Sequence, residues 1–311
     1  MEKIAIGVDI GGSHISCAAC GLSEKKYFGE TFSESELDNQ GTAGDIIAVW
    51  ARTIREAMQK VIRGKVTGIG FAMPGPFDYV KGIGLFKGNN KKYEGMNGLN
   101  VPQALRNEIR LAGNIPIRFI NDATAFALGE DWLGKASGTK NSLSITLGTG
   151  FGSAFLRNHL PVVTGERVPE MGCVWYLPFE NGSADDYFST RGLLNRYHVK
   201  TGKALSGVKE LAAQATKEPV IQSLFDDFGL KLGIFLHPWI DKSETEILVI
   251  GGNISNAFNL FGKSLTACFA DKRIKISIVV SGLKETASII GSALLADDSY
   301  YKELLPVLEH M

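Results

Sequence analysis

The sequence predicts an α/β protein built as two lobes around a cleft. Its 311 residues exceed the length at which a single hydrophobic core usually stops growing, so two domains are expected. Short β-branched and apolar runs of strand length alternate with longer stretches in which apolar residues recur at helical spacing. A strand, glycine turn and second strand also occur twice, once at the start of the chain and once near its middle. This echo indicates two related halves.

The first part of the chain predicts strands and helices in mixed order. Residues 4–9 and 15–20 are apolar runs on either side of a glycine turn, which predicts a β-hairpin. Further strands are expected at 27–32, 66–72 and 115–120, and helices at 45–62, 101–111 and 123–133. Residues 73–100 are rich in Gly, Asn and Pro, as an irregular binding loop would be.

The second part opens with the repeated strand, turn and strand at 143–156. After it, helices are expected at 221–236 and 286–296, and strands at 247–250 and 274–280. We therefore expect an N-terminal α/β lobe at 1–122, completed by a C-terminal helix at 297–311, and a larger lobe at 123–296.

Composition limits the partners and the compartment. Basic and acidic residues balance at 33 each and no basic stretch occurs, so no nucleic-acid-binding surface is expected. Neither a signal peptide nor an apolar run of membrane-spanning length is apparent, which predicts a cytoplasmic protein without a membrane partner. The four cysteines are expected to be reduced thiols: Cys17, Cys20, Cys173 and Cys268.

The opening turn, Asp9-Ile10-Gly11-Gly12-Ser13, has the composition of a phosphate-binding loop. Adjacent glycines let the backbone turn tightly and present N–H groups to an anion, and Ser13 adds a hydroxyl donor. Asp9, at the strand end, can hold a hydrated Mg²⁺. An ordinary Gly-Gly hairpin that binds no ligand is the alternative.

A second turn, Gly148-Thr149-Gly150, follows another strand. It leads into a strand rather than a helix, which argues against a dinucleotide fingerprint, and the Gly-Lys-Ser/Thr ending of a P-loop is missing. Two phosphate-type turns at equivalent places in two halves fit one nucleotide held between lobes. A third cluster, Gly251-Gly252-Asn253, could pack flat against a base or ribose, or could simply enter a helix with Asn253 or Ser255 as its cap.

Asn121-Asp122 stand where a strand ends and small residues open a helix. An acid at this position is well placed to accept a proton from a bound hydroxyl, which makes Asp122 a candidate general base. The local sequence equally allows Asp122 to be the N-cap of the helix.

Together these motifs resemble the ROK family of sugar kinases and repressors, within the actin-like ATPase and hexokinase fold. The resemblance spans nearly the whole chain and is carried by residues 9–13, 70–78, 121–123, 147–152, 165–172 and 250–253. It implies ATP and Mg²⁺ as cofactors, a small-molecule sugar as substrate and a homodimer. By the same resemblance Asp122 is the catalytic base, Asn121 and Glu170 bind sugar hydroxyls, Pro74 and Gly75 line the sugar side, and the glycine turns clamp ATP.

The chain departs from the family pattern on the sugar side. The family usually has a histidine three residues after the glutamate that matches Glu170, followed by a cysteine-rich zinc segment. This chain has Cys173 there, and 174–195 contains no further cysteine or histidine, so no zinc site is expected. The resemblance places Asp185 at a second sugar-binding glutamate, with Asp186 as the alternative.

The sequence therefore predicts transfer of the γ-phosphoryl group of ATP to a hexose, glucose or a related sugar, at its 6-hydroxyl. Two alternatives remain open. One is a kinase for another sugar, such as fructose, allose or an N-acetylhexosamine. The other is a sugar-binding regulator with weak catalysis, related to the family's repressors, although a DNA-reading domain has no room ahead of a turn that begins at residue 9.

Overall fold

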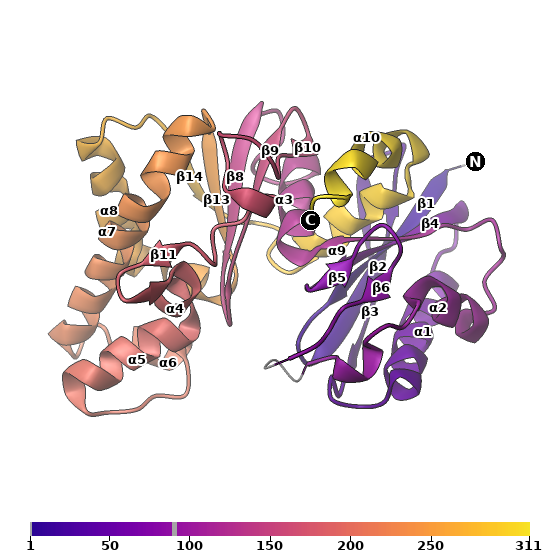
Figure 1. Ribbon diagram of the computed structural model, residues 1–311, viewed down its shortest axis with the longest axis horizontal. Helices are drawn as coiled ribbons and strands as arrows, with labels where there is room; N and C mark the ends of the chain where they lie inside the picture. The colour runs from indigo at the N-terminus through magenta and orange to yellow at the C-terminus, as the bar shows by residue number, and fades with distance from the viewer. Residues whose placement is uncertain (1, 89–91) are drawn as a thin grey trace. The chain divides into compact units, whose positions relative to one another are not determined.

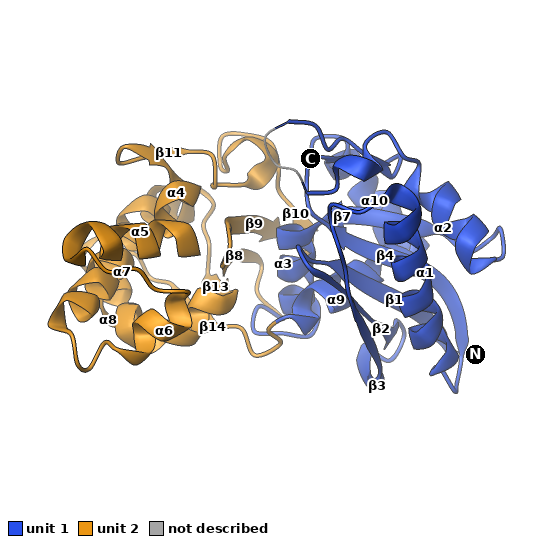
Figure 2. Cartoon of the chain, turned by 90° about the horizontal axis from the view of Figure 1, so that it is seen from below, with its two compact units in different colours: residues 1–137, 285–311 blue, residues 138–284 orange. Residues whose placement is uncertain are grey.

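The computed structural model describes residues 2–88 and 92–311, which form two compact units. The first unit comprises residues 1–137 and 285–311, and the second comprises residues 138–284 (Figure 2). Residues 89–91 of the expected binding loop lie outside the described residues.

The first unit combines one main sheet with helices (Figure 1). Its main strands are β1 (Lys3–Ile10), β2 (His14–Gly21), β3 (Lys26–Glu36), β4 (Lys65–Met73) and β7 (Ile117–Asn121). Its helices are α1 (Ala43–Gln59), α2 (Val101–Ile109), α3 (Asp122–Trp132), α9 (Thr286–Ala293) and α10 (Asp298–Leu308). Shorter elements are β5 (Phe77–Asp78), β6 (Ile83–Gly84) and the 3₁₀ turns η1 (Glu94–Met96) and η4 (Leu294–Ala296).

The order of this sheet is β3-β2-β1-β4-β7. β1 and β2 form the predicted hairpin, and β4 and β7 continue the sheet parallel to β1. Helices pack on both faces of this sheet, as two neighbouring residues of β4 show. Gly70 faces α9, where Ser292 approaches it closely. Phe71 points to the opposite face, where its ring centroid lies 6.1 Å from that of Trp50 in α1. Burial on both faces explains the continuous apolar runs of these strands.

The division between the units differs from the expected domains, which ended the first lobe at residue 122 and gave 123–296 to the second. Helix α3 and helix α9 both belong to the first unit, because they pack on each other and α9 packs on β1 and β4. Glycines allow this close contact: a Cβ on Gly129 would lie 2.0 Å from the carbonyl oxygen of Ala287, and one on Gly291 would lie 1.8 Å from that of Ala125. Helical periodicity alone does not reveal such a contact.

The second unit repeats the first in its sheet. Its main strands are β8 (Asn141–Leu147), β9 (Phe151–Arg157), β10 (Leu160–Pro161), β13 (Ile247–Gly251) and β14 (Ser277–Val280), in the order β10-β9-β8-β13-β14. β8 and β9 form an antiparallel hairpin, and β13 and β14 run parallel to β8. A hairpin followed by two parallel strands thus occurs in both sheets in the same order, which confirms the predicted internal repeat at the level of topology.

The remaining elements of the second unit are mostly helical. They are α4 (Ala184–Phe188), α5 (Thr190–Thr201), α6 (Val208–Ala213), α7 (Pro219–Lys242), α8 (Phe258–Asp271), the short strands β11 (Pro178–Phe179) and β12 (Gly182–Ser183), and the 3₁₀ turns η2 (Glu170–Gly172) and η3 (Asn253–Ala257).

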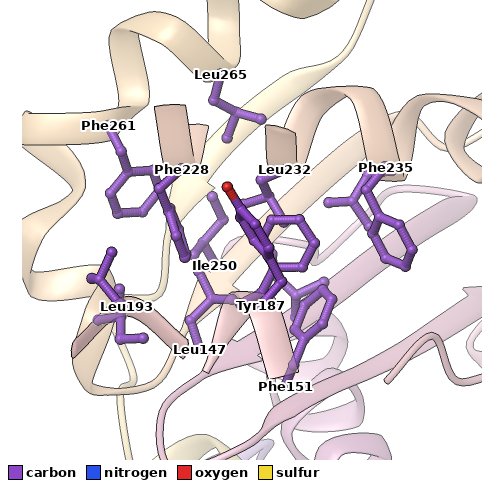
Figure 3. Close-up of a cluster of buried hydrophobic side chains, with 14 of the residues drawn as sticks. Leu147, Phe151, Tyr187, Leu193, Phe228, Leu232, Phe235, Ile250, Phe261 and Leu265 are labelled. Carbon is purple, nitrogen blue, oxygen red and sulfur yellow. The ribbon is translucent and has the colours of Figure 1, made fainter. Parts of the chain in front are cut away.

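An aromatic-rich core holds the second unit together (Figure 3). The Phe228 and Phe261 rings of α7 and α8 meet edge to face at 5.2 Å, and Phe188 of α4 meets Phe228 at 5.6 Å. Each such side chain contributes about 1.5–3 kcal/mol when fully buried. This core fixes α4 against β9, where Phe151 contacts the Phe188 ring at 5.3 Å.

Among the described residues, no helix is both long and apolar enough to cross a membrane. The four cysteines carry free thiols, and Cys17, Cys20 and Cys268 are buried.

Replacing Gly291 by alanine is expected to lower the free energy of unfolding by about 3 kcal/mol, because the new methyl group would force α9 away from α3. Chemical denaturation would measure the loss. Gly44→Ala in α1 is the matched control: its Cβ would have no neighbour closer than 3.8 Å, so the better helix propensity of alanine gives a change of zero to about 1 kcal/mol in favour of the fold. Equal stability of the two variants would contradict this account of the α3–α9 contact.

Candidate active site

The candidate residues of the first unit gather at the carboxyl ends of its parallel strands. Asp9 of β1 pairs with Ala72 of β4, and Met73 of β4 pairs with Asn121 of β7. The pairing therefore brings Asp9, the segment after Met73 and Asn121-Asp122 to one edge of the sheet. This is the edge at which open α/β sheets commonly bind ligands.

The opening turn is a hairpin whose glycines provide space. Neither Gly11 nor Gly12 has a left-handed φ, but a Cβ on Gly11 would lie 2.9 Å from the His14 ring. The Gly11 N–H donates to the His14 carbonyl at 3.0 Å, and the Tyr93 hydroxyl donates to the Gly11 carbonyl at 2.5 Å. Asn39 donates its side-chain amide to the Gly12 carbonyl. The turn is thus held from outside by side chains that the sequence pattern did not single out.

Asp122 is the first residue of α3, and Asn121 is its N-cap. The Asn121 Oδ1 accepts from the N–H groups of Ala123 and Thr124 at 3.0 and 3.2 Å. The alternative that Asp122 caps the helix is therefore wrong. The Asp122 carboxylate accepts from the Ala123 N–H at 2.9 Å, and its pKa is raised by burial, against the lowering effect of that hydrogen bond.

Asp9 lies in the electrostatic field of other carboxylates. Its pKa is raised to about 8, first by burial and then by repulsion from Asp122 and Glu285. A magnesium ion is commonly held by one or two carboxylates together with water and phosphate oxygens, and a cation beside Asp9 would relieve this repulsion. The residues therefore fit a hydrated Mg²⁺. Glu285 carried no sequence signal, because it reaches this position only through the return of the chain to the first unit.

The Asn121 amide also links to the loop after β4. Its Nδ2 donates to the Tyr79 hydroxyl at 3.4 Å, and that hydroxyl donates to the Met73 carbonyl at 3.1 Å. A Cβ on Gly75 would lie 3.4 Å from the same hydroxyl. Asn121 and the Pro74-Gly75 segment are thus brought together around Tyr79, a residue the sequence pattern missed.

In the second unit the second and third glycine clusters meet. The Gly148 N–H donates to the Gly150 carbonyl at 3.0 Å, which closes the turn between β8 and β9. Gly251 pairs with Thr146 of β8, directly before this turn. Gly252 has a φ of 77°, and a Cβ there would lie 2.4 Å from the Leu147 carbonyl oxygen. Close packing against β8 therefore requires this glycine.

Asn253 begins η3 and does not cap α8. Neither η3 nor α8 has a side-chain N-cap, and the Ser255 hydroxyl donates to the Gly252 carbonyl at 2.7 Å. The alternative that Asn253 or Ser255 is a helix cap is wrong.

Glu170 and Cys173 belong to the turn η2 and its end. The Glu170 side chain is exposed, while its carbonyl accepts from the Tyr176 hydroxyl at 3.2 Å. Burial raises the pKa of the Cys173 thiol to about 11, so it is neutral at physiological pH. Within the described residues, no group of three or more His, Cys, Asp or Glu side chains could hold a metal ion.

Asp185 and Asp186 lie near the start of α4 and have different environments. One Asp185 carboxylate oxygen accepts from the Phe151 N–H at 2.7 Å, at the end of the Gly148–Gly150 turn. Asp186 accepts from the Ser183 N–H at 3.1 Å and the Ser183 hydroxyl at 2.7 Å, in a capping box that begins α4. Asp186 is therefore a helix-capping residue, and Asp185 is tied to the glycine turn.

Comparison with known proteins agrees with this arrangement. The sequence model of the ROK family matches residues 5–299. The N-acetyl-D-glucosamine kinase of Photobacterium profundum is 25% identical over 320 residues, covering 93% of this chain and 98% of its own. The glucokinase of Thermotoga maritima is 29% identical, with 93% and 95% covered. A ROK family glucokinase from Streptomyces griseus, solved in complex with glucose and AMPPNP, has a TM-score of 0.71 at 20% identity, covering 94% of this chain and 98% of its own. The chain has the same two-lobed, actin-like ATPase fold.

Proposed function

Because this chain belongs to the ROK family, we propose that it transfers the γ-phosphoryl group of ATP to a hydroxyl of a hexose, with Asp122 as the general base. The observation that carries the proposal is that Asn121 and Asp122 have different roles at the start of α3. Asn121 caps the helix, so the Asp122 carboxylate does not serve as the cap, and burial raises its pKa. A raised pKa makes the ionised carboxylate a stronger base toward a bound hydroxyl.

Phosphoryl transfer depends mainly on positioning and on neutralisation of charge. Asp9 would hold a hydrated Mg²⁺, which supplies positive charge to the phosphates. The opening turn and the Gly148–Gly150 turn bind phosphate oxygens through backbone N–H groups other than those of Gly11 and Gly148, which donate within the turns. Asp122 accepts the proton of the attacking sugar hydroxyl, so that the oxygen becomes a better nucleophile.

The sugar is oriented by Asn121, Glu170, Pro74 and Gly75. Cys173 contributes a neutral thiol where the family usually has an imidazole, so it can donate at most one weak hydrogen bond. The relatives include both a glucokinase and an N-acetyl-D-glucosamine kinase. We place the substrate in this class of hexoses, phosphorylated at the primary 6-hydroxyl.

A coupled assay of ADP release should detect turnover with at least one member of a panel of hexoses, amino sugars and N-acetyl sugars. Turnover should require Mg²⁺ and reach the range of about 1–100 s⁻¹ that is usual for kinases. Omission of the sugar is the control for ATP hydrolysis. Absence of turnover with every sugar, while isothermal titration shows a sugar bound, would replace the kinase by a sugar-binding regulator.

A further inference from the structure

Asp185 is bound directly to the Gly148–Gly150 turn of the second unit. Its Oδ1 accepts from the Phe151 N–H at 2.7 Å, a short bond of the charge-assisted kind. The same oxygen lies only 3.1 Å from where a Cβ of Gly150 would be. The carboxylate is therefore packed directly against the backbone of the Gly148–Gly150 turn, and glycine at position 150 leaves the room for it.

The second carboxylate oxygen and the backbone N–H of Asp185 also have partners. Its second oxygen pairs with the Arg191 guanidinium at 3.3 Å, and its N–H donates to the Trp175 carbonyl at 2.9 Å. Both carboxylate oxygens thus already have partners within the second unit. Arg191 also pairs with Asp186 at 2.8 Å, so one cation faces two carboxylates.

The segment that carries Asp185 holds both ends of the turn. Five residues after Asp185, at the start of α5, the Thr190 N–H donates to the Gly148 carbonyl at 2.8 Å. Asp185 therefore fixes the turn where β9 begins, and Thr190 fixes it where β8 has ended. The core contact between Phe188 and Phe151 anchors the same segment against β9.

From this geometry we propose that Asp185 is a positioning residue for the nucleotide phosphates, acting through the Gly148–Gly150 turn, and not a ligand of the sugar. The proposal rests on the proposed function, in which this turn binds phosphate. Backbone N–H groups stabilise a transferring phosphoryl group best when they are oriented before it arrives, and the Asp185 bond fixes their orientation. The carboxylate would itself repel phosphate, and Arg191, which it shares with Asp186, offsets part of that charge.

The length of the side chain supports this role. By the resemblance, the ROK family has a glutamate at the position of Asp185. The glutamate side chain is one methylene longer than that of aspartate. Because the Asp185 carboxylate already touches the turn, that extra length would push Gly150 and Phe151 out of place or break the bond to the Phe151 N–H. An aspartate thus fits the turn as it stands.

Steady-state kinetics of Asp185→Ala, measured with the most active sugar of the panel, should show a KM for ATP raised about tenfold or more, as expected for the loss of a charge-assisted hydrogen bond. The KM for the sugar should stay within about twofold of the wild type. Asp185→Asn should restore most of the ATP affinity, because its amide oxygen can still accept from the Phe151 N–H. Asp186→Ala is the matched control: it removes a neighbouring carboxylate that pairs with Arg191 but does not touch the turn, and its KM for ATP should not change.

Asp185→Glu keeps the charge and gives a second test if the alanine variant is unstable. If Asp185 positions the turn, Asp185→Glu should bind AMPPNP with lower affinity than the wild type, as measured by titration calorimetry. If Asp185 binds the sugar instead, the variant should keep its affinity for AMPPNP and change only its KM for the sugar. A selective rise in the sugar KM in either variant, or loss in Asp185→Ala without rescue by Asp185→Asn, would overturn the proposal. Wild-type protein that binds AMPPNP but phosphorylates no sugar would refute the kinase function alone. Absence of AMPPNP binding by the wild type would overturn both.

Discussion

Asp122→Asn is expected to lower kcat by about 10²–10⁴-fold, the contribution usual for a positioned general base. The amide cannot accept the proton of the sugar hydroxyl, yet it has the size of the carboxylate and its oxygen can still accept from the Ala123 N–H. The variant should bind the sugar with nearly unchanged affinity and should unfold at the same temperature or a higher one, because it removes a buried negative charge. The coupled assay, titration with the sugar and a thermal melt measure the three quantities.

Asp298→Asn is the matched control for this variant. Asp298 is the first residue of α10, as Asp122 is of α3, and it also follows a capping residue, Asp297. Its side chain is exposed and pairs with Arg118 at the surface. Asp298→Asn should leave kcat unchanged. Undiminished turnover in Asp122→Asn would remove Asp122 from the mechanism.

The sheets of both units could be predicted from the sequence because their strands carry a strong local signal. Residues 4–8 are apolar without alternation, since β1 is covered on both faces, and the glycine turn at residues 11–12 marks the hairpin. The same reasoning found β8 and β9 and the echo between the halves. The structure adds that β4 and β7 repeat in β13 and β14, so the duplication extends to the strand order of both sheets.

Features that depend on tertiary contact were not predictable. Helices α4, α5, α6 and α8 were not found, and their formation depends on burial around the aromatic core as much as on local pattern. The assignment of α3 to the first unit was not predictable, because nothing in residues 123–133 shows that α3 packs against α9 rather than on the second sheet.

In the candidate site too, features that depend on tertiary contacts could not be predicted from the sequence. Asn121 and Asp122 are both good N-cap residues, and only the backbone shows that Asn121 is the cap. The resemblance placed Asp185 on the sugar side, but its hydrogen bond to Phe151 could not be read from residue types. Tyr79, Tyr93 and Glu285 contribute to the site through contacts distant in sequence.

Asp9→Asn should remove most activity and yet stabilise the protein when Mg²⁺ and nucleotide are absent. In the unfolded chain the Asp9 carboxyl titrates near its usual pKa of 3.8, and in the folded protein near 8. Between these values the folded state binds more protons than the unfolded state, so this group lowers the stability of the wild type as pH rises from about 4 to about 8. Asparagine does not titrate and avoids this loss.

The gain in stability should therefore be negligible near pH 4 and should grow to a few kcal/mol by pH 8, at no more than about 1.4 kcal/mol for each pH unit. Thermal melts of both proteins from pH 4 to pH 8 measure it. Addition of MgATP should narrow the difference at pH 8, because a cation bound beside Asp9 stabilises the ionised carboxylate of the wild type alone. A gain that is the same at every pH would indicate a packing effect instead. A variant with full activity would show that Asp9 does not hold the metal.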